Sequence, residues 1–76
     1  MTDLTQAREV IVVSWEDRAW GAAHPLHNRY RSYYVADGVR HPGVLEATAL
    51  MASGLLRADD LRMPDGQVGC VYRRAK

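Results

Sequence analysis

Arginine and tyrosine alternate in one short stretch of the chain, "NRYRSYY" at positions 28–34. Guanidinium groups bind carboxylates and phosphates, and aromatic rings stack on bases or fill pockets of a protein partner. The stretch predicts a surface that contacts a protein or, as the alternative, a nucleic acid. A purely structural interpretation places two of the tyrosines in the core and the arginines in solvent. The predicted partner-contacting residues are Trp20, Arg29, Tyr30, Arg31, Tyr33 and, on the less apolar side of a predicted helix, Leu50.

The three histidines and the single cysteine do not form a recognisable metal or catalytic motif. His24 and His27, with His41 and Cys70, are of the types that bind zinc, but a structural site needs paired ligands at both ends. Asp17, His27 and Cys70 can be combined into a nucleophilic site, yet no nucleophile motif surrounds the cysteine. No glycine-rich phosphate loop is present. We therefore expect no metal, no other cofactor and no enzymatic activity.

The element that must organise these side chains is "HPGVLEATALMASGLLR", residues 41–57. Pro42 suits a first helical turn, and Gly54 suits the residue just beyond a helix end. Between them, apolar residues recur at spacings of three and four, which is the helical period. A helix that is apolar nearly all round is normally central in a domain or covered by a second molecule. The sequence predicts a buried central helix here.

The N-terminal stretch, residues 2–23, has two interpretations. Apolar residues step along one helical face from Leu4 to Ala22, which favours a single long helix. The β-branched run "VIVV" at positions 10–13 instead favours a buried strand over residues 9–13, followed by a helix over 15–23. The helix is the preferred prediction, and the strand remains the alternative.

Two further segments surround the central helix. The segment "LHNRYRSYYVADGV" presents its aromatic residues on one helical face, or equally forms a strand that enters a hairpin at Asp37-Gly38. Near the C-terminus, Pro64-Asp65-Gly66 is a strong turn signal between residues 61–63 and the alternating stretch 67–73. The predicted fold is therefore a helix-rich α+β domain with an N-terminal helix, an aromatic second segment, the buried central helix and a C-terminal β-hairpin.

Length and charge limit the classes of function. A chain of 76 residues has room for one domain, residues 1–76. Ten basic and nine acidic residues leave a formal charge of +1, so no strong attraction to nucleic acid or anionic membrane is expected. One cysteine, no long apolar run and no signal-peptide pattern predict a cytoplasmic protein that makes no membrane contact.

A helix that ends in "GLL", followed by a strand, a "DG" turn and a strand ending in "VYRR", resembles the recognition helix and wing of a winged helix-turn-helix domain. The resemblance covers residues 42–74 and gives the fold prediction a winged-helix-like variant. It implies a nucleic-acid binder, the alternative function, with Arg57, Arg62, Arg73 and Arg74 near phosphates. The stretch "GVLEATALMAS" contains none of the side chains that read base edges, which favours a core or interface helix.

Segments such as "AREVI", "SWEDRAW" and "HPLHNRYRSYY" resemble short arginine- and alanine-rich proteins encoded by phages of actinobacteria. This likeness implies no activity and favours a protein that binds a host macromolecule or a phage component in the host cytoplasm. The preferred function is a small non-enzymatic binding protein, either a modulator of a host or phage protein or a homo-oligomer.

Overall fold

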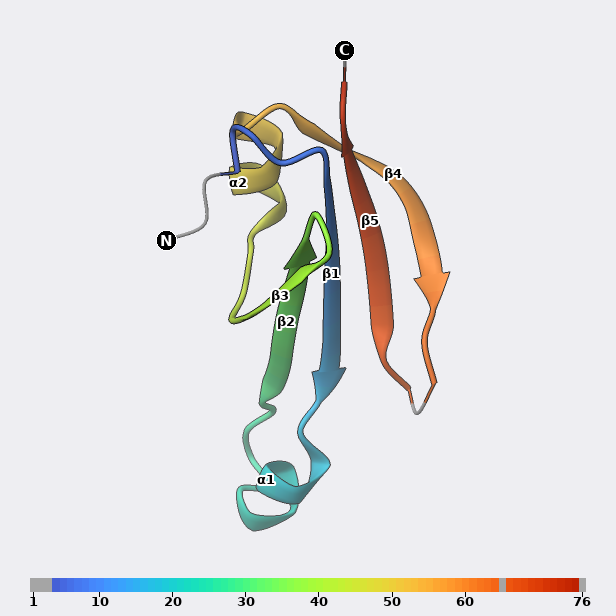
Figure 1. Cartoon of the computed structure of the whole chain (residues 1–76). Helices are drawn as coiled ribbons and strands as arrows, with labels where there is room; N and C mark the ends of the chain where they lie inside the picture. The colour runs from blue at the N-terminus through green and yellow to red at the C-terminus, as the bar shows by residue number, and fades with distance from the viewer. Residues whose placement is uncertain (1–3, 65, 76) are drawn as a thin grey trace.

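The computed structural model describes residues 4–64 and 66–75, and these form one five-stranded antiparallel sheet with two short helices (Figure 1). In chain order the elements are β1 (Glu9–Glu16), α1 (Arg18–Ala23), β2 (Tyr30–Ala36), β3 (Val39–Pro42), α2 (Ala47–Ala52), β4 (Leu55–Arg62) and β5 (Val68–Arg74). Their order across the sheet is β3-β2-β1-β5-β4. Strands hold 48% of the described residues and helices only 17%, so the predicted helix-rich α+β class is wrong.

The long N-terminal helix is wrong because residues 10–13 lie in β1, the central strand. β-branched side chains lose rotamer freedom against the preceding turn of a helix but fit the pleated surface of a sheet. β1 pairs with β2 from Val10 to Glu16 and with β5 from Glu9 to Ser14, so both of its edges are hydrogen-bonded. The strand alternative is the one that the structure adopts, with α1 following directly.

The predicted central helix over residues 41–57 is reduced to α2. Residues 41 and 42 of the predicted helix belong to β3 instead, and β4 begins at Leu55. Gly43 and Gly54 have φ angles of 118° and 86°, which end helical geometry on both sides of α2. Within residues 4–64 and 66–75, no helix is long and apolar enough to cross a lipid bilayer.

The aromatic segment forms β2 and joins β3 through a two-residue turn. Asp37 and Gly38 have φ angles of 49° and 84°, and positive values at both positions define the type I′ hairpin turn. The Asp37 carboxylate also accepts hydrogen bonds of 3.0 Å from the backbone N–H groups of Arg8 and Glu9. This side chain therefore ties the turn to the beginning of β1.

The C-terminal hairpin is present, but its first strand is much longer than predicted. β4 pairs with β5 from Leu55 to Arg62, with a register shift between Arg57 and Asp59 that marks a β-bulge. Within the turn, Gly66 has a φ of 74°, and Asp65 lies outside the described residues. Residues 55–57, which were predicted to end the central helix, are instead the first residues of β4.

Arg74 joins three separate segments near the chain ends. Its Nε donates to the Ala7 carbonyl at 2.7 Å, and one terminal nitrogen donates to the Ser53 carbonyl at 2.7 Å. The other terminal nitrogen donates to the Leu4 carbonyl. The guanidinium thus links the N-terminal segment, the end of α2 and β5, and it contributes to the fold instead of facing solvent.

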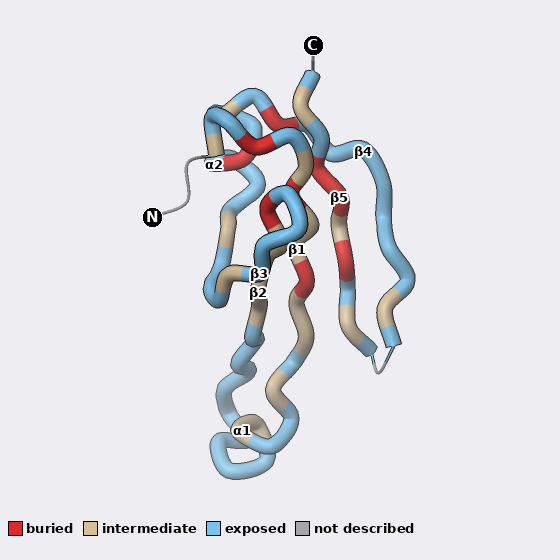
Figure 2. Tube along the Cα trace, viewed as in Figure 1, coloured by how far each residue is buried: buried red, intermediate tan, exposed pale blue. Residues whose placement is uncertain are grey.

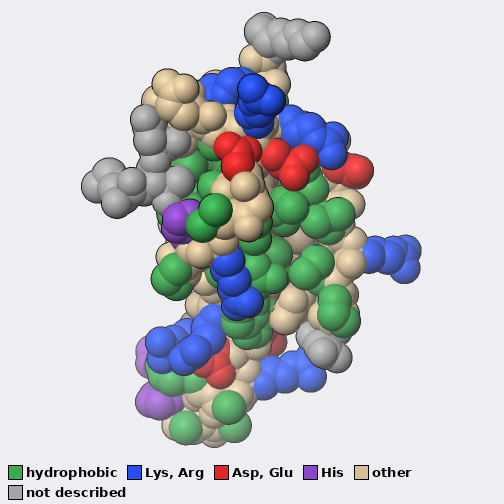
Figure 3. Space-filling model, viewed as in Figure 1, with side chains coloured by type: hydrophobic (Ala, Val, Ile, Leu, Met, Phe, Trp, Pro, Cys, Tyr) green, Lys and Arg blue, Asp and Glu red, His purple; other side chains and the backbone are tan. Residues whose placement is uncertain are grey.

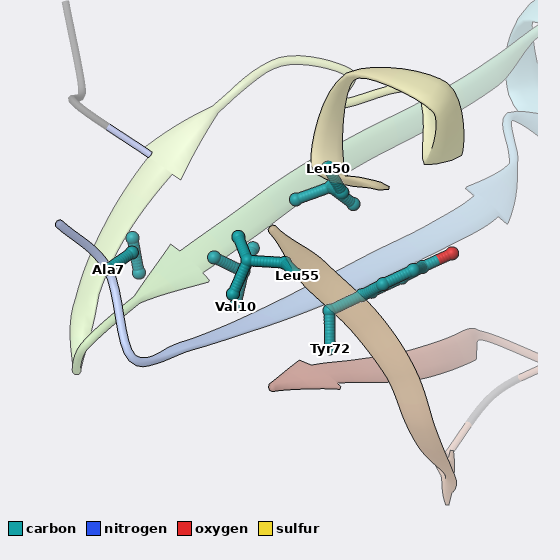
Figure 4. Close-up of a cluster of buried hydrophobic side chains, with 6 residues drawn as sticks. Ala7, Val10, Leu50, Leu55 and Tyr72 are labelled. Carbon is teal, nitrogen blue, oxygen red and sulfur yellow. The ribbon is translucent and has the colours of Figure 1, made fainter. Parts of the chain in front are cut away.

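The core lies at one end of the sheet, between α2 and the sheet face that bears Val10 (Figure 2). Leu50, Leu55 and Val10 are completely buried, and Figure 4 shows their side chains pointing toward one another. The full cluster contains Ala7, Val10, Ala36, Leu50, Leu55 and Tyr72. The prediction that Leu50 contacts a partner does not fit this burial, because its side chain is covered by its own chain.

Candidate binding surface

The side of the sheet opposite α2 carries a second apolar surface. Side chains alternate along a strand, and cross-strand partners point to the same side of the sheet. The side chains of Ile11, Val13 and Trp15 therefore lie on the other face of the sheet from the core residue Val10. Cross-strand partners complete this surface, which we call the open face: Ile11, Val13, Trp15, Arg31, Tyr33, Val35, Leu56, Leu61 and Val71. Arg40, the β3 partner of Val35, and Arg73, the β5 partner of Leu56, lie on the same side of the sheet.

The open face is well packed within the sheet but is not covered by a second layer. Val13 and Val71 are buried by their neighbours, whereas Leu61 and Leu56 are 38% and 51% exposed. Among the described residues, α2 packs on the other face, and α1 lies beyond the lower end of β1 and β2 (Figure 1). Figure 3 shows apolar side chains gathered along the middle of the sheet. An uncovered apolar sheet face is a common mark of an interaction surface.

Three carboxylates lie toward the end of the open face where β1 begins. Glu9 is the first residue of β1, Asp37 follows the end of β2, and Asp59 on β4 pairs with Val71. Glu9 forms an ion pair with Arg73, in which the Arg73 Nε donates to the Glu9 Oε2 at 3.1 Å. We call these three carboxylates the acidic row. Arg73 offsets one of the three charges, so this end of the open face has a net negative border.

An open hollow of about 460 Å³ lies at the opposite end, where β3 stops beside β2. Three arginines and two aromatic residues contribute to its walls. We call it the arginine hollow, and its lining residues are Trp15, Arg29, Tyr30, Arg31, Ser32, Arg40, Gly43 and Val44. The Ser32 hydroxyl donates to the Gly43 carbonyl at 3.0 Å, which holds the chain leaving β3 against β2.

Aromatic contacts hold the arginines of the hollow in place. The Arg40 guanidinium lies 3.9 Å from the centroid of the Tyr33 ring, and Arg29 lies 5.7 Å from the centroid of Trp20. Trp15 meets Tyr33 edge to face, with 5.9 Å between ring centroids. Cation–π contacts orient a guanidinium without neutralising its charge. The hollow is therefore positive and partly preorganised.

Asp17 connects the hollow to α1. Its carboxylate accepts the backbone N–H of Trp20 at 3.1 Å, as an N-cap, and pairs with the Nε of Arg31 at 2.9 Å. The Trp20 hydrogen bond is the main reason that the pKa of Asp17 lies below its ordinary value, and Arg31 lowers it further. The pair fixes the direction in which the Arg31 side chain extends.

Of the predicted contact residues, the structure gathers five at one end of the molecule. Arg29, Tyr30 and Arg31 line the hollow, and Tyr33 and Trp20 support it through the ring contacts. Trp15 and Arg40 also lie at the hollow but are not among the contact residues predicted from the sequence. The β-branched run at residues 10–13, which favours a strand, was the signal for Trp15. Arg40 reaches the hollow only because the Asp37-Gly38 turn folds β3 back on β2.

The arginines of the alternative nucleic-acid surface do not form one group. Arg57 pairs with Asp60, Arg73 pairs with Glu9, and Arg74 donates to backbone carbonyls. Arg62 lies on the edge strand β4 and makes no ion pair with any residue among 4–64 and 66–75. Three of these four guanidinium groups already have partners within the chain.

The histidines and the cysteine are likewise apart. Cys70 packs against the core, and its Sγ lies 3.8 Å from Asp60. The ring of His24 stacks on Trp20, with centroids 4.0 Å apart. Among the described residues, no group of three or more His, Cys, Asp or Glu side chains has the arrangement needed to hold a metal ion.

No known protein family, curated protein or solved structure matches this chain significantly. The open face, the acidic row and the arginine hollow are therefore the features that indicate a function.

Proposed function

We propose that this protein is a non-catalytic binding module that holds an acidic segment of a partner protein in the arginine hollow. The observation that carries the proposal is the convergence of Arg29, Arg31 and Arg40 on one open hollow beside Trp15 and Tyr30. Guanidinium groups are suited to carboxylates because their N–H donors match both oxygens. Asp17 engages the Nε of Arg31, so the terminal nitrogens of Arg31 can donate to a second carboxylate.

A protein suits this surface better than a nucleic acid does. The hollow continues into the open face, where a partner can bury apolar side chains against Ile11 and Val35. A long phosphate backbone following the same surface would approach Glu9 and Asp37, which repel it. The formal charge of +1 also supplies little long-range attraction to a polyanion.

The test is a titration of the protein with hexaglutamate. Binding is monitored by tryptophan fluorescence, because Trp15 lines the hollow. Arg40→Gln should weaken binding by about 3- to 10-fold, the effect expected for one partly exposed ionic contact. Arg62→Gln is the matched control, since it removes the same charge from the opposite edge of the sheet. It should leave the affinity nearly unchanged.

Two results would contradict the proposal. Equal weakening by Arg40→Gln and Arg62→Gln would show that hexaglutamate responds only to total charge. Tighter binding of a single-stranded hexanucleotide than of hexaglutamate, with a steep loss on added salt, would assign the hollow to nucleic acid.

A further inference from the structure

We infer that the partner is a second copy of this chain, packed face to face through the open face with its strands antiparallel to those of the first copy. The inference rests on the proposed function, because it names the acidic segment that enters the arginine hollow. That segment is the part of the acidic row formed by Glu9 and Asp37.

Symmetry limits how two copies of this sheet can meet. A two-fold axis that brings the open faces together must lie in the plane between them. If the axis runs along the strands, the acidic row of one copy meets the acidic row of the other. If it runs across the strands, the two ends of the sheet exchange places, and opposite charges meet. Charge therefore selects the antiparallel arrangement.

The distances along β1 fit this arrangement. Glu9 and Trp15 are six residues apart, which is about 20 Å in a strand. An axis that crosses the interface level with Val12 puts Glu9 of each copy opposite Trp15 of the other. Asp37 lies beside Glu9, and Arg31 is the direct partner of Trp15, so carboxylates meet the arginine hollow at both ends.

The same axis matches the apolar centre with itself. Ile11 of one copy lies level with Val13 of the other, and Val35 lies level with Tyr33 and the Arg40 guanidinium on its ring, since these residues are at equal distances from the axis. Two sheets packed in this way would form a sandwich, in which the core of interdigitating side chains is about 10 Å thick. The second copy supplies the layer that the described residues do not place over the open face.

The decisive experiment uses two opposite charge reversals and measures mass by sedimentation equilibrium. Glu9→Arg places like charges beside Arg31 at both ends of the dimer, and Arg31→Glu does the same beside Glu9. Each variant alone should dimerise at least about tenfold more weakly than the unmodified chain. A one-to-one mixture should recover dimers, because one chain then carries only positive groups at these positions and the other only negative groups.

Recovery in the mixture separates docking from folding. Each reversal also removes an intramolecular ion pair, from Glu9 to Arg73 or from Arg31 to Asp17. A loss of dimers caused by damage to the fold would persist on mixing. Circular dichroism of each variant provides the independent check that the sheet is intact.

A matched pair of apolar changes tests the centre of the interface. Val35→Ser lies on the open face and should weaken the dimer about tenfold, because the change occurs twice in each dimer. Val68→Ser is the control. Val68 is 59% exposed and pairs with Ser14 on the other face of the sheet, so dimerisation should not change.

A chain that remains monomeric at about 1 mM would overturn the inference. If that monomer still binds hexaglutamate through Arg40, the proposed function stands and the open face belongs to a different protein. A dimer that resists both charge reversals, or a mixture that does not associate, also overturns the antiparallel arrangement. If the mixture of the two variants forms dimers that hexaglutamate neither binds nor weakens, that result supports the second copy as the partner but contradicts the proposed binding of other acidic segments.

Discussion

Asp17 is the residue on which the position of Arg31 depends. Its carboxylate is at once the N-cap of α1 and the ion-pair partner of Arg31, and its pKa is lowered mainly by the Trp20 hydrogen bond. A lowered pKa in the folded state means that the charged carboxylate stabilises the fold at pH values above its ordinary value of 3.8. This stabilisation is lost as the pH falls through the lower, folded-state pKa.

We expect Asp17→Asn to remove this part of the pH dependence. Unfolding by urea, measured between pH 7 and pH 2 (about the range over which an aspartate titrates), should show a smaller loss of stability at acid pH in the variant. The amide still accepts the Trp20 N–H, so α1 should persist. Parallel pH profiles for the two proteins would contradict the assignment. Glu46→Gln is the control, because the Glu46 side chain forms no capping hydrogen bond at α2.

At the scale of the element, the Asp37-Gly38 turn places β3 beside β2 and so brings Arg40 to the hollow. A type I′ turn needs positive φ at both positions, which side chains other than Asn, Asp and Gly adopt at a cost of about 1–2 kcal/mol. Backbone conformation, and not crowding, is the constraint at Gly38, because an added Cβ would meet nothing within 4 Å.

Gly38→Ala should therefore destabilise the protein by about 1 kcal/mol in urea unfolding. Gly21→Ala is its matched control. An added Cβ there also meets nothing within 4 Å, but Gly21 lies in α1 without a positive φ, so alanine should stabilise by up to about 1 kcal/mol. The same sign of change for both substitutions would contradict the turn assignment.

β1 and the former central helix show where element prediction succeeds and where it does not. Residues 10–13 carry a local β-branched signal, but the helical spacing of Leu4 to Ala22 spans more residues and outweighed it. Residues 41–57 carry an unbroken helical period, yet Gly43 and Gly54 both adopt positive φ and divide it. A periodic pattern alone does not say where a helix must end, because chain reversal depends on what the next strand pairs with.

At the scale of the whole molecule, the core is small and lies at one end. Leu50 is completely buried and belongs to a core cluster that also contains residues of β1, β2, β4 and β5. Small domains have little stability to lose, because they bury a smaller share of their surface than large ones. Loss of one large core side chain should therefore endanger the entire fold.

We predict that Leu50→Ala costs about 2–5 kcal/mol, the range for large-to-small changes in a core. Thermal unfolding followed by circular dichroism should show a strongly lowered midpoint or no folded state. Met51→Ala, on the same helix, is the control. Met51 is 58% exposed, so its truncation should change stability by about 0.5 kcal/mol or less. Similar effects of the two changes would mean that α2 does not pack as described.

The sequence by itself determined the local features: the turn at Asp37-Gly38, the C-terminal hairpin and the gathering of arginine and tyrosine in residues 28–34. These depend on the conformational preferences of a few adjacent residues. Only the tertiary structure decided that residues 10–13 are a strand, that Leu50 is buried and that Arg40 joins Trp15 at the hollow. These outcomes depend on strand pairing between distant segments, such as Glu9 with Arg73, which a local pattern such as the β-branched run at residues 10–13 permits but does not specify.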